Sequence, residues 1–212
     1  MDDIVKQAMA KWPNVPYCYG WLALDARGNW RMRDEHAQRN ALPGDKLTNA
    51  ALVAFIARNY QRDEQGNWYF QNGPQRVYVN LETTPFVART DPAHGFVLHT
   101  GAPLEKVDAA FITEAGELIL KSGEIVAQLD DRDVAEALSA LEADGQRVSD
   151  EALLAWLEGN ARLAPALHVS GSSVPLQRMD RAVVADRFGF RRTPSPAGRR
   201  RIPCPHRSSF GA

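Results

Sequence analysis

The sequence has few cysteines, no long apolar run and no apolar segment after its acidic N-terminus. Its 212 residues include two cysteines, Cys18 and Cys204. These can form one disulfide or remain two thiols, but they cannot make a disulfide framework. No stretch approaches the ~18 consecutive apolar residues of a membrane-spanning helix, and no signal peptide is recognisable. These absences predict a soluble, cytoplasmic protein.

The common catalytic and ligand-binding motifs are also absent. The chain contains no Gly-x-Gly-x-x-Gly, no Gly-x-x-x-x-Gly-Lys-Ser/Thr, no Gly-x-Ser-x-Gly, no His-Glu-x-x-His and no Cys-x-x-Cys. Their absence lowers the expectation of the commonest nucleotide, hydrolase and zinc chemistries. We therefore expect no cofactor, no bound metal and no catalytic residue, which favours a protein that is not an enzyme.

Charge is distributed unevenly along a chain of ordinary globular composition, 44% hydrophobic and 24% charged. Residues 177–212 carry nine arginines and two aspartates, a balance of +7, so the preceding residues carry −8 of the total of −1. A basic tail can contact nucleic-acid phosphates, because such contacts need only charge. The alternative is a solubilising tail or one that folds back on the acidic body.

One pattern occurs three times, at residues 25–30, 63–68 and 113–118. Each copy has a polar cluster, a glycine, a polar residue and a large apolar residue, with flanks that alternate in period two. This pattern is typical of a β-hairpin whose tight turn needs a positive φ angle. It predicts a scaffold and carries no chemistry.

Hydrophobic periodicity predicts the remaining elements. Helices are expected over residues 3–12 and 45–61, after a cap at Asp130 or Asp131, and from Ser149 to Gly159. Strands are expected over residues 17–24, 30–33, 68–70, 76–81, 86–88, 96–98, 110–112, 118–120 and 125–129.

These elements predict an α+β fold, in which antiparallel hairpins and a meander pack against three or four helices. The predicted organisation is a body over residues 1–168, a partly docked segment over 169–190 and a disordered Arg/Pro-rich tail over 191–212. Two similar helix-plus-hairpin subdomains, 1–100 and 101–168, would account for the recurring turn, although chance recurrence of a good turn is an equal explanation.

Two stretches are distinctive: Tyr19-Gly20-Trp21-Leu22 with Asp25 and Gly28, and residues 68–77. In these stretches the chain resembles a small family of uncharacterised proteobacterial proteins. The resemblance covers residues 1–190 and implies a cytoplasmic bacterial protein without known catalytic residues. The Arg/Pro-rich end departs from this resemblance.

Aromatic and arginine side chains share the first hairpins and supply the candidate binding residues. Such aromatics either fill a core as cross-strand pairs or line a groove that stacks on a ligand or on bases. The candidate ligand or nucleic-acid contacts are Arg31, Arg33, Arg76, Trp68, Tyr78, Arg191, Arg192, Arg199, Arg200 and Arg201.

Three further groups have metal-ligating side chains. His94 and His99 flank a predicted strand near Asp91, Cys204 and His206 lie in the tail, and three aspartates precede a helix at 130–133. A metal site needs more ligands than the first two groups offer. Helix capping explains the aspartates without a metal.

The leading functional hypothesis is a non-catalytic binding or regulatory module, with an unknown protein or small molecule as its partner and the capacity to form a homodimer. The alternative is nucleic-acid binding through the Arg-rich tail. A second alternative is an enzyme with a site near His94 and His99.

Overall fold

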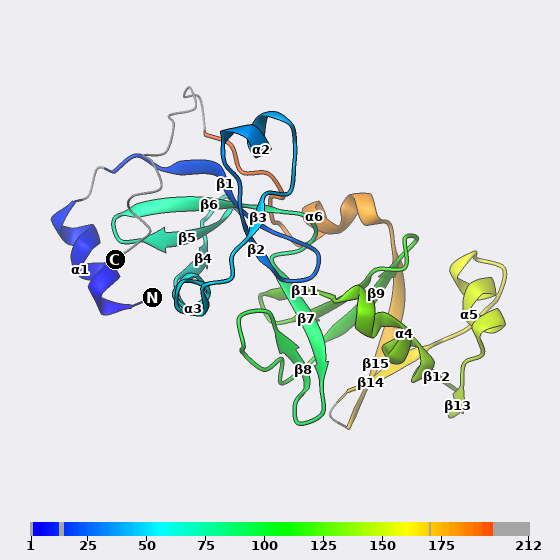
Figure 1. Ribbon diagram of the computed structural model, residues 1–212. Helices are drawn as coiled ribbons and strands as arrows, with labels where there is room; N and C mark the ends of the chain where they lie inside the picture. The colour runs from blue at the N-terminus through cyan, green and yellow to red at the C-terminus, as the bar shows by residue number, and fades with distance from the viewer. Residues whose placement is uncertain (1, 13–14, 170, 197–212) are drawn as a thin grey trace. The chain divides into compact units, whose positions relative to one another are not determined.

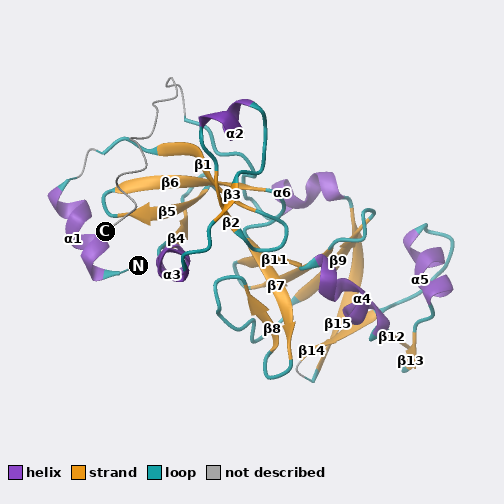
Figure 2. Cartoon of the chain, in the orientation of Figure 1, coloured by secondary structure: helices purple, strands orange, loops and turns teal. Residues whose placement is uncertain are grey.

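The computed structural model describes residues 2–12, 15–169 and 171–196. The protein is mainly β, with one six-stranded and one nine-stranded sheet in the described residues. Figure 2 shows strands and loops dominating, with short helices beside them. The predicted α+β class, with three or four helices as a packing layer, is therefore wrong. The two sheets are also mixed, since the six-stranded sheet contains one parallel pair and the nine-stranded sheet two, which consecutive hairpins did not predict.

The chain forms two compact units that are not simple halves of the sequence. The first comprises residues up to Asp25, Asn29–Thr83 and the chain from Gly189, and the second comprises Ala26–Gly28 and Thr84–Phe188.

The first unit contains the six-stranded sheet, in the order β3-β2-β1-β6-β5-β4. Its strands are β1 (Cys18–Leu24), β2 (Trp30–Met32), β3 (Asp45–Lys46), β4 (Tyr60–Arg62), β5 (Trp68–Asn72) and β6 (Gln75–Leu81), and its helices are α1 (Asp3–Lys11), α2 (Glu35–Arg39) and α3 (Ala50–Arg58). Figure 1 shows β1, β6 and β5 lying alongside one another.

The six-stranded sheet is curled, and aromatic side chains fill its inner face. The ring of Trp30 on β2 lies 5.1 Å from that of Tyr60 on β4, although three strands separate β2 from β4 in the sheet. Tyr60 in turn contacts Trp68 at 4.8 Å. Helix α3 packs on this face, where Phe55 meets Phe70 edge-on at 5.4 Å. Burial of Trp30, Trp68 and Phe70 stabilises this unit.

The second unit contains the nine-stranded sheet, in the order β13-β12-β14-β15-β9-β10-β11-β7-β8. Its strands are β7 (Phe86–Asp91), β8 (Gly95–Leu98), β9 (Ala109–Thr113), β10 (Leu118–Ser122), β11 (Ile125–Leu129), β12 (Glu142–Ala143), β13 (Gln146–Arg147), β14 (Ala166–Val169) and β15 (Ser172–Met179). Its helices are α4 (Asp131–Ser139), α5 (Asp150–Leu157) and α6 (Val184–Arg187), the last preceded by a 3₁₀ turn over Arg181–Val183.

One face of the nine-stranded sheet forms an aliphatic core. Leu118, Leu120 and Leu129 are fully buried there, and Ala137 of α4 and Trp156 of α5 belong to the same cluster. Residues of α4 and α5 therefore cover this face of the sheet.

The three recurring motifs form one local structure. In each turn the first residue donates its N–H to the carbonyl four residues later, and its side-chain oxygen accepts the N–H of that later residue. The first residues are Asp25, Asp63 and Thr113. The glycine three residues after each of these, Gly28, Gly66 or Gly116, has a φ angle of 77°, 82° or 78°, respectively. Side-chain acceptance and a positive-φ glycine together explain why this sequence recurs.

The two sheets share a topology that the sequence did not reveal. The strand order β2-β1-β6-β5-β4 in the first sheet corresponds to the order β8-β7-β11-β10-β9 in the second. The central pair is parallel in both, β1 with β6 and β7 with β11, and the flanking pairs are antiparallel. The repeated element is thus five strands within residues 18–81 and within 86–129.

The segment after Gly189 is bonded to the first unit. The N–H of Arg191 donates to the carbonyl of Gly66 at 2.9 Å, and the N–H of Leu81 donates to the carbonyl of Arg192 at 2.8 Å. Phe190 and Pro194 are buried. Arg191 and Arg192, expected in a disordered tail, are therefore held in place, whereas residues 197–212 lie outside the described part of the chain.

Short strands explain why the sequence suggested more helix than the structure contains. Residues 45–61 were predicted as one helix, but α3 covers only Ala50–Arg58, with strands at Asp45–Lys46 and Tyr60–Arg62. The antiparallel pair of β14 and β15 is not among the strands that the sequence predicted. In the described residues, no helix has the length and apolar content that crossing a membrane requires.

Candidate binding site

The outer face of the six-stranded sheet carries a group of tyrosines around one arginine. Side chains alternate along a strand, so Val77 and Val79 of β6 point inward while Arg76 and Tyr78 point to the opposite face, as the sequence predicted. Pairing of β5 with β6 sets Tyr69 directly opposite Tyr78. This arrangement places a polar aromatic layer on the outer face.

We call this group the tyrosine–arginine cluster; it comprises Tyr17, Tyr19, Tyr69, Arg76 and Tyr78. Tyr19 and Tyr78 are stacked, with centroids 4.5 Å apart and planes 9° apart. The guanidinium carbon of Arg76 lies 4.6 Å from the Tyr69 ring and 5.4 Å from the Tyr17 ring. Tyr17 is 46% exposed, so the cluster reaches the surface. Cation–π contacts of this kind fix the position of the charge.

The second recurring turn supports the cluster from one side. The hydroxyl of Tyr78 donates to Oδ2 of Asp63 at 3.2 Å, and Asn67 bonds to both oxygens of the same carboxylate. Burial raises the pKa of Tyr78 well above its ordinary value. Although burial opposes it, the bonds from Asn67 and Tyr78 lower the pKa of Asp63. Asp63 is therefore a carboxylate and Tyr78 a neutral phenol near neutral pH.

Arg76 differs from the other arginines proposed as contacts. Within the described ranges, no carboxylate forms an ion pair with Arg76, and its contacts are with tyrosines. Arg31 is bound to Asp25 at 2.8 Å, and Arg33 donates to the carbonyl of Leu42 at 3.0 Å. Of the predicted contact arginines that the structure describes, Arg76 is thus the one that geometry leaves available to an external anion.

The remaining predicted contacts lie elsewhere. Arg191 donates to the Gln65 carbonyl at 3.2 Å, and Arg192 donates to that of Glu82. Trp68 packs against Tyr60 on the inner face, opposite to Tyr78. Arg199, Arg200 and Arg201 lie outside the described residues. The structure brings together only Arg76 and Tyr78 of the predicted set, and the role of the tail in nucleic-acid binding stays a prediction.

Sequence reasoning missed Tyr17, Tyr19 and Asp63 as members or supports of this site. The alternation in β6 was visible, but Tyr19 reaches Tyr78 only because the pairing of β1 with β6 shifts between Cys18 and Leu22. Such a shift, next to Gly20 with φ of 83°, is not readable from a period-two pattern.

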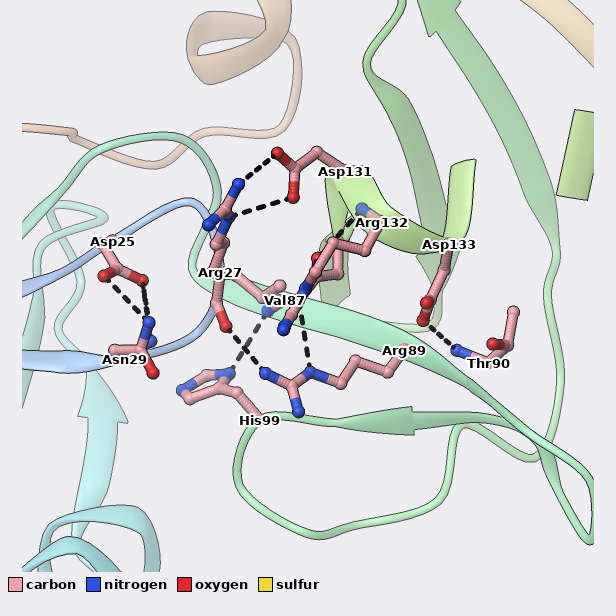
Figure 3. A network of polar contacts seen from close by, with 11 residues as sticks. Asp25, Arg27, Asn29, Val87, Arg89, Thr90, His99, Asp131, Arg132 and Asp133 are labelled. Carbon is pink, nitrogen blue, oxygen red and sulfur yellow. Dashed lines mark hydrogen bonds and ion pairs between the residues drawn. The ribbon is translucent and has the colours of Figure 1, made fainter. Parts of the chain in front are cut away.

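A separate polar network lies in the second unit (Figure 3). Figure 3 shows Arg27 facing Asp131, which it contacts through two hydrogen bonds of 2.9 and 3.1 Å. Asp130 is completely buried; it caps α4 and accepts Nε and Nη2 of Arg132 at 2.9 and 2.6 Å. Arg89 approaches the same carboxylate at 3.3 Å. The charged side chains Arg27, Arg89, Arg132, Asp130 and Asp131 thus have partners within the second unit, which is typical of a structural network.

The buried carboxylate of this network predicts that the folded protein is less stable in acid. Hydrogen bonds from Arg132 hold the pKa of Asp130 well below its ordinary value near 3.8. A carboxylate whose folded pKa is depressed contributes stability above its unfolded pKa, and that contribution is lost as the pH falls toward the folded value. We expect the free energy of unfolding to decrease as pH falls below about 4. Urea titrations of the wild type and of Asp130→Ala between pH 6 and 3 check this, because the variant should show a shallower decrease.

The two histidines of the enzyme hypothesis lie at opposite ends of β8. His94 contacts Asp91 at 2.9 Å in the turn before β8, and the N–H of Val87 donates to Nδ1 of His99 at 3.2 Å after it. At ~3.3 Å per residue, the strand separates them by roughly 16 Å. They cannot share one catalytic or metal site.

Metal-ligating residues do not converge in the part of the chain that the structure describes. No group of three or more His, Cys, Asp or Glu side chains there has the arrangement to hold a metal ion. Asp133 accepts the N–H of Thr90 at 2.8 Å instead (Figure 3). The Cys204 and His206 pair lies outside the described residues.

Comparison with known proteins places the chain in a family. Residues 1–195 match the model of a family described as a protein of unknown function (DUF2946). The chain belongs to this family. The resemblance to an uncharacterised family, stated from sequence, is confirmed to that extent. No curated protein matches the chain.

Two solved structures show a distant likeness. A DUF1285 family protein from Silicibacter pomeroyi DSS-3 has a TM-score of 0.45 and 16% identity, and covers 83% of this chain and 95% of its own. A DUF1285 family protein from Shewanella baltica OS155 has a TM-score of 0.38 and 14% identity, and covers 55% of this chain and 88% of its own. At these sequence identities and TM-scores, the two structures support no functional conclusion for this chain.

Proposed function

We propose that this DUF2946 protein is a non-catalytic binding module, and that the tyrosine–arginine cluster holds an anionic group of its ligand. The observation that carries the proposal is Arg76, whose guanidinium lies over two tyrosine rings and has no carboxylate partner among the described residues. A guanidinium positioned in this way retains N–H donors for an acceptor on a ligand. The bacterial origin, the cytoplasmic location and the homodimer stay predictions.

The polar network of the second unit does not compete for this role. Its arginines are matched by Asp130 and Asp131, and its histidine and aspartates bond to the backbone. A site that binds an external anion needs a cation that forms no ion pair of its own, and among the described residues Arg76 is in no ion pair. The proposal therefore rests on the first unit alone.

A thermal-shift screen of a small-molecule library tests the proposal. Ligands that bind the cluster should raise the melting temperature of the wild type but not of Arg76→Gln, because only the folded state with Arg76 binds them. Arg39→Gln is the matched control: it removes another arginine of the same unit, on α2, whose side chain is 75% exposed. It should respond like the wild type.

The screen can also contradict the proposal. Hits that stabilise wild type and Arg76→Gln equally would place the binding site elsewhere. Chemical conversion of a hit by the wild-type protein, detected by mass spectrometry and lost in a point variant, would show that the protein is an enzyme.

A further inference from the structure

The charge around Arg76 restricts what kind of anion can bind. Arg76 is the one cation of the cluster, and the carboxylate of Asp63 is bonded to Tyr78 within it. Tyr19 and Tyr78, whose pKa values are raised by burial, add no charge, and among the described residues no second arginine or lysine takes part in the ring contacts of this group. A dianion would find one positive charge and a nearby negative one. A single negative charge matches the site better.

The shape of the Arg76 guanidinium also favours a singly charged anion, a carboxylate. A guanidinium that stacks on aromatic rings donates through its N–H edge, and two parallel N–H groups match the two oxygens of a carboxylate. The exposed ring of Tyr17 lies beside Arg76 and offers an apolar surface next to the charge. A ligand that uses both features needs a carboxylate and an apolar or aromatic body within a few bonds of each other.

We infer that the ligand of the tyrosine–arginine cluster is a monocarboxylate with an apolar or aromatic body, bound by Arg76 through its carboxylate and by Tyr17 through its body. The inference rests on the proposed function and adds the ligand class. Free aromatic acids and the C-terminal carboxylate of a peptide share this chemistry. Phosphate monoesters and nucleic acids do not share this chemistry. A phosphate monoester carries nearly two negative charges near neutral pH, and a nucleic acid carries many.

A matched probe series tests the ligand class. Phenylacetate carries the carboxylate and the ring, phenylacetamide removes the charge, and phenyl phosphate keeps the ring with a larger charge. Binding to the wild type and to Arg39→Gln is followed by NMR through the Nε–Hε signal of Arg76, assigned by its loss in Arg76→Gln, and the affinity of variants that lack this signal is measured from the proton line widths of phenylacetate itself. We expect phenylacetate to bind more tightly than phenyl phosphate, phenylacetamide to leave the signal unmoved, and Arg76→Gln to weaken phenylacetate about tenfold or more, as the loss of a charge-assisted bond implies.

Variants keep the test independent of folding. Arg76→Lys retains the charge but loses the two-pronged geometry, so phenylacetate should bind it with intermediate affinity. Arg39→Gln should bind like the wild type. Circular dichroism and thermal melts establish that each variant is folded before its affinity is compared.

The outcomes separate the inference from the proposed function. If phenyl phosphate, or a single-stranded oligonucleotide, binds more tightly than phenylacetate and still depends on Arg76, the ligand class is wrong and the proposed function stands. If library hits depend on Arg76 while phenylacetate does not move its signal, the ligand class is again wrong. If no ligand depends on Arg76, the proposed function fails. A peptide ending in Phe, compared with the same peptide ending in an amide, identifies the source of the carboxylate. Binding of the free-acid peptide indicates a peptide C-terminus, and binding of phenylacetate alone indicates a free aromatic acid. Either result supports the ligand class.

Discussion

Replacing Asp130 by Ala is expected to lower the free energy of unfolding by about 3 kcal/mol, since an N-cap is worth about 1 kcal/mol and charge-assisted hydrogen bonds about 1.5–3 kcal/mol. The carboxylate is completely buried, caps α4 through the Arg132 N–H, and accepts two bonds from the Arg132 side chain and an ion pair from Arg89. The variant loses all of these at once. Urea denaturation at pH 7 measures the change.

The neighbouring Asp131 provides the control. It lies in the first turn of the same helix and pairs with Arg27, but both side chains are more than half exposed. Solvent-exposed ion pairs contribute about 0–1 kcal/mol. Asp131→Ala should therefore change stability by less than about 1 kcal/mol, and Asp130→Asn should fall between the two because an amide oxygen still caps the helix. Equal losses for Asp130→Ala and Asp131→Ala would show that burial of Asp130 adds nothing.

Replacing Gly66 by Ala is expected to cost about 2 kcal/mol more than the same change at Gly116. The two glycines occupy the same place in two copies of one turn, with φ angles of 82° and 78°. At both positions, an alanine in the left-handed region of backbone conformation costs ~1–2 kcal/mol of stability. At Gly66 the added methyl group would also overlap the carbonyl oxygen of Gly189, whereas nothing lies within 4 Å at Gly116.

The physical cause of the extra cost is displacement of the segment after Gly189. Moving it away weakens the bond from Arg191 N–H to Gly66 and the 2.6 Å bond from Arg62 to the Gly189 carbonyl, each worth about 1 kcal/mol. Urea midpoints for the two variants, measured side by side, test the difference. Equal losses would mean that this segment contributes little to the first unit.

Local features of the fold could be predicted from the sequence because they depend on neighbouring residues. The turns at Asp25, Asp63 and Thr113 follow from a side-chain acceptor and a glycine within five residues. The parallel pairs of β1 with β6 and of β7 with β11 could not be predicted, since they join strands with much chain between them. Two-residue strands such as β3 and β12 carry no periodicity, so the amount of strand was underestimated.

The candidate site was predictable only in part. Alternation along β6 placed Arg76 and Tyr78 on one face, and this depends on local geometry alone. Whether an arginine is available depends on its partners, and nothing in the sequence distinguishes Arg31, bound to Asp25, from Arg76, which lies on tyrosine rings. The structure supplies that distinction, and the proposed function follows from it.

The division of the chain into units has a consequence for the order in which they fold during synthesis. The second unit has all of its residues once Phe188 has been made, but the first unit includes the chain from Gly189, where Phe190 is buried. Domains generally fold in the order in which they are translated. Here the six strands of the first unit are synthesised before Thr84, but the buried Phe190 and the backbone bonds of Arg191 and Arg192 join that unit only after Thr84–Phe188 has been made.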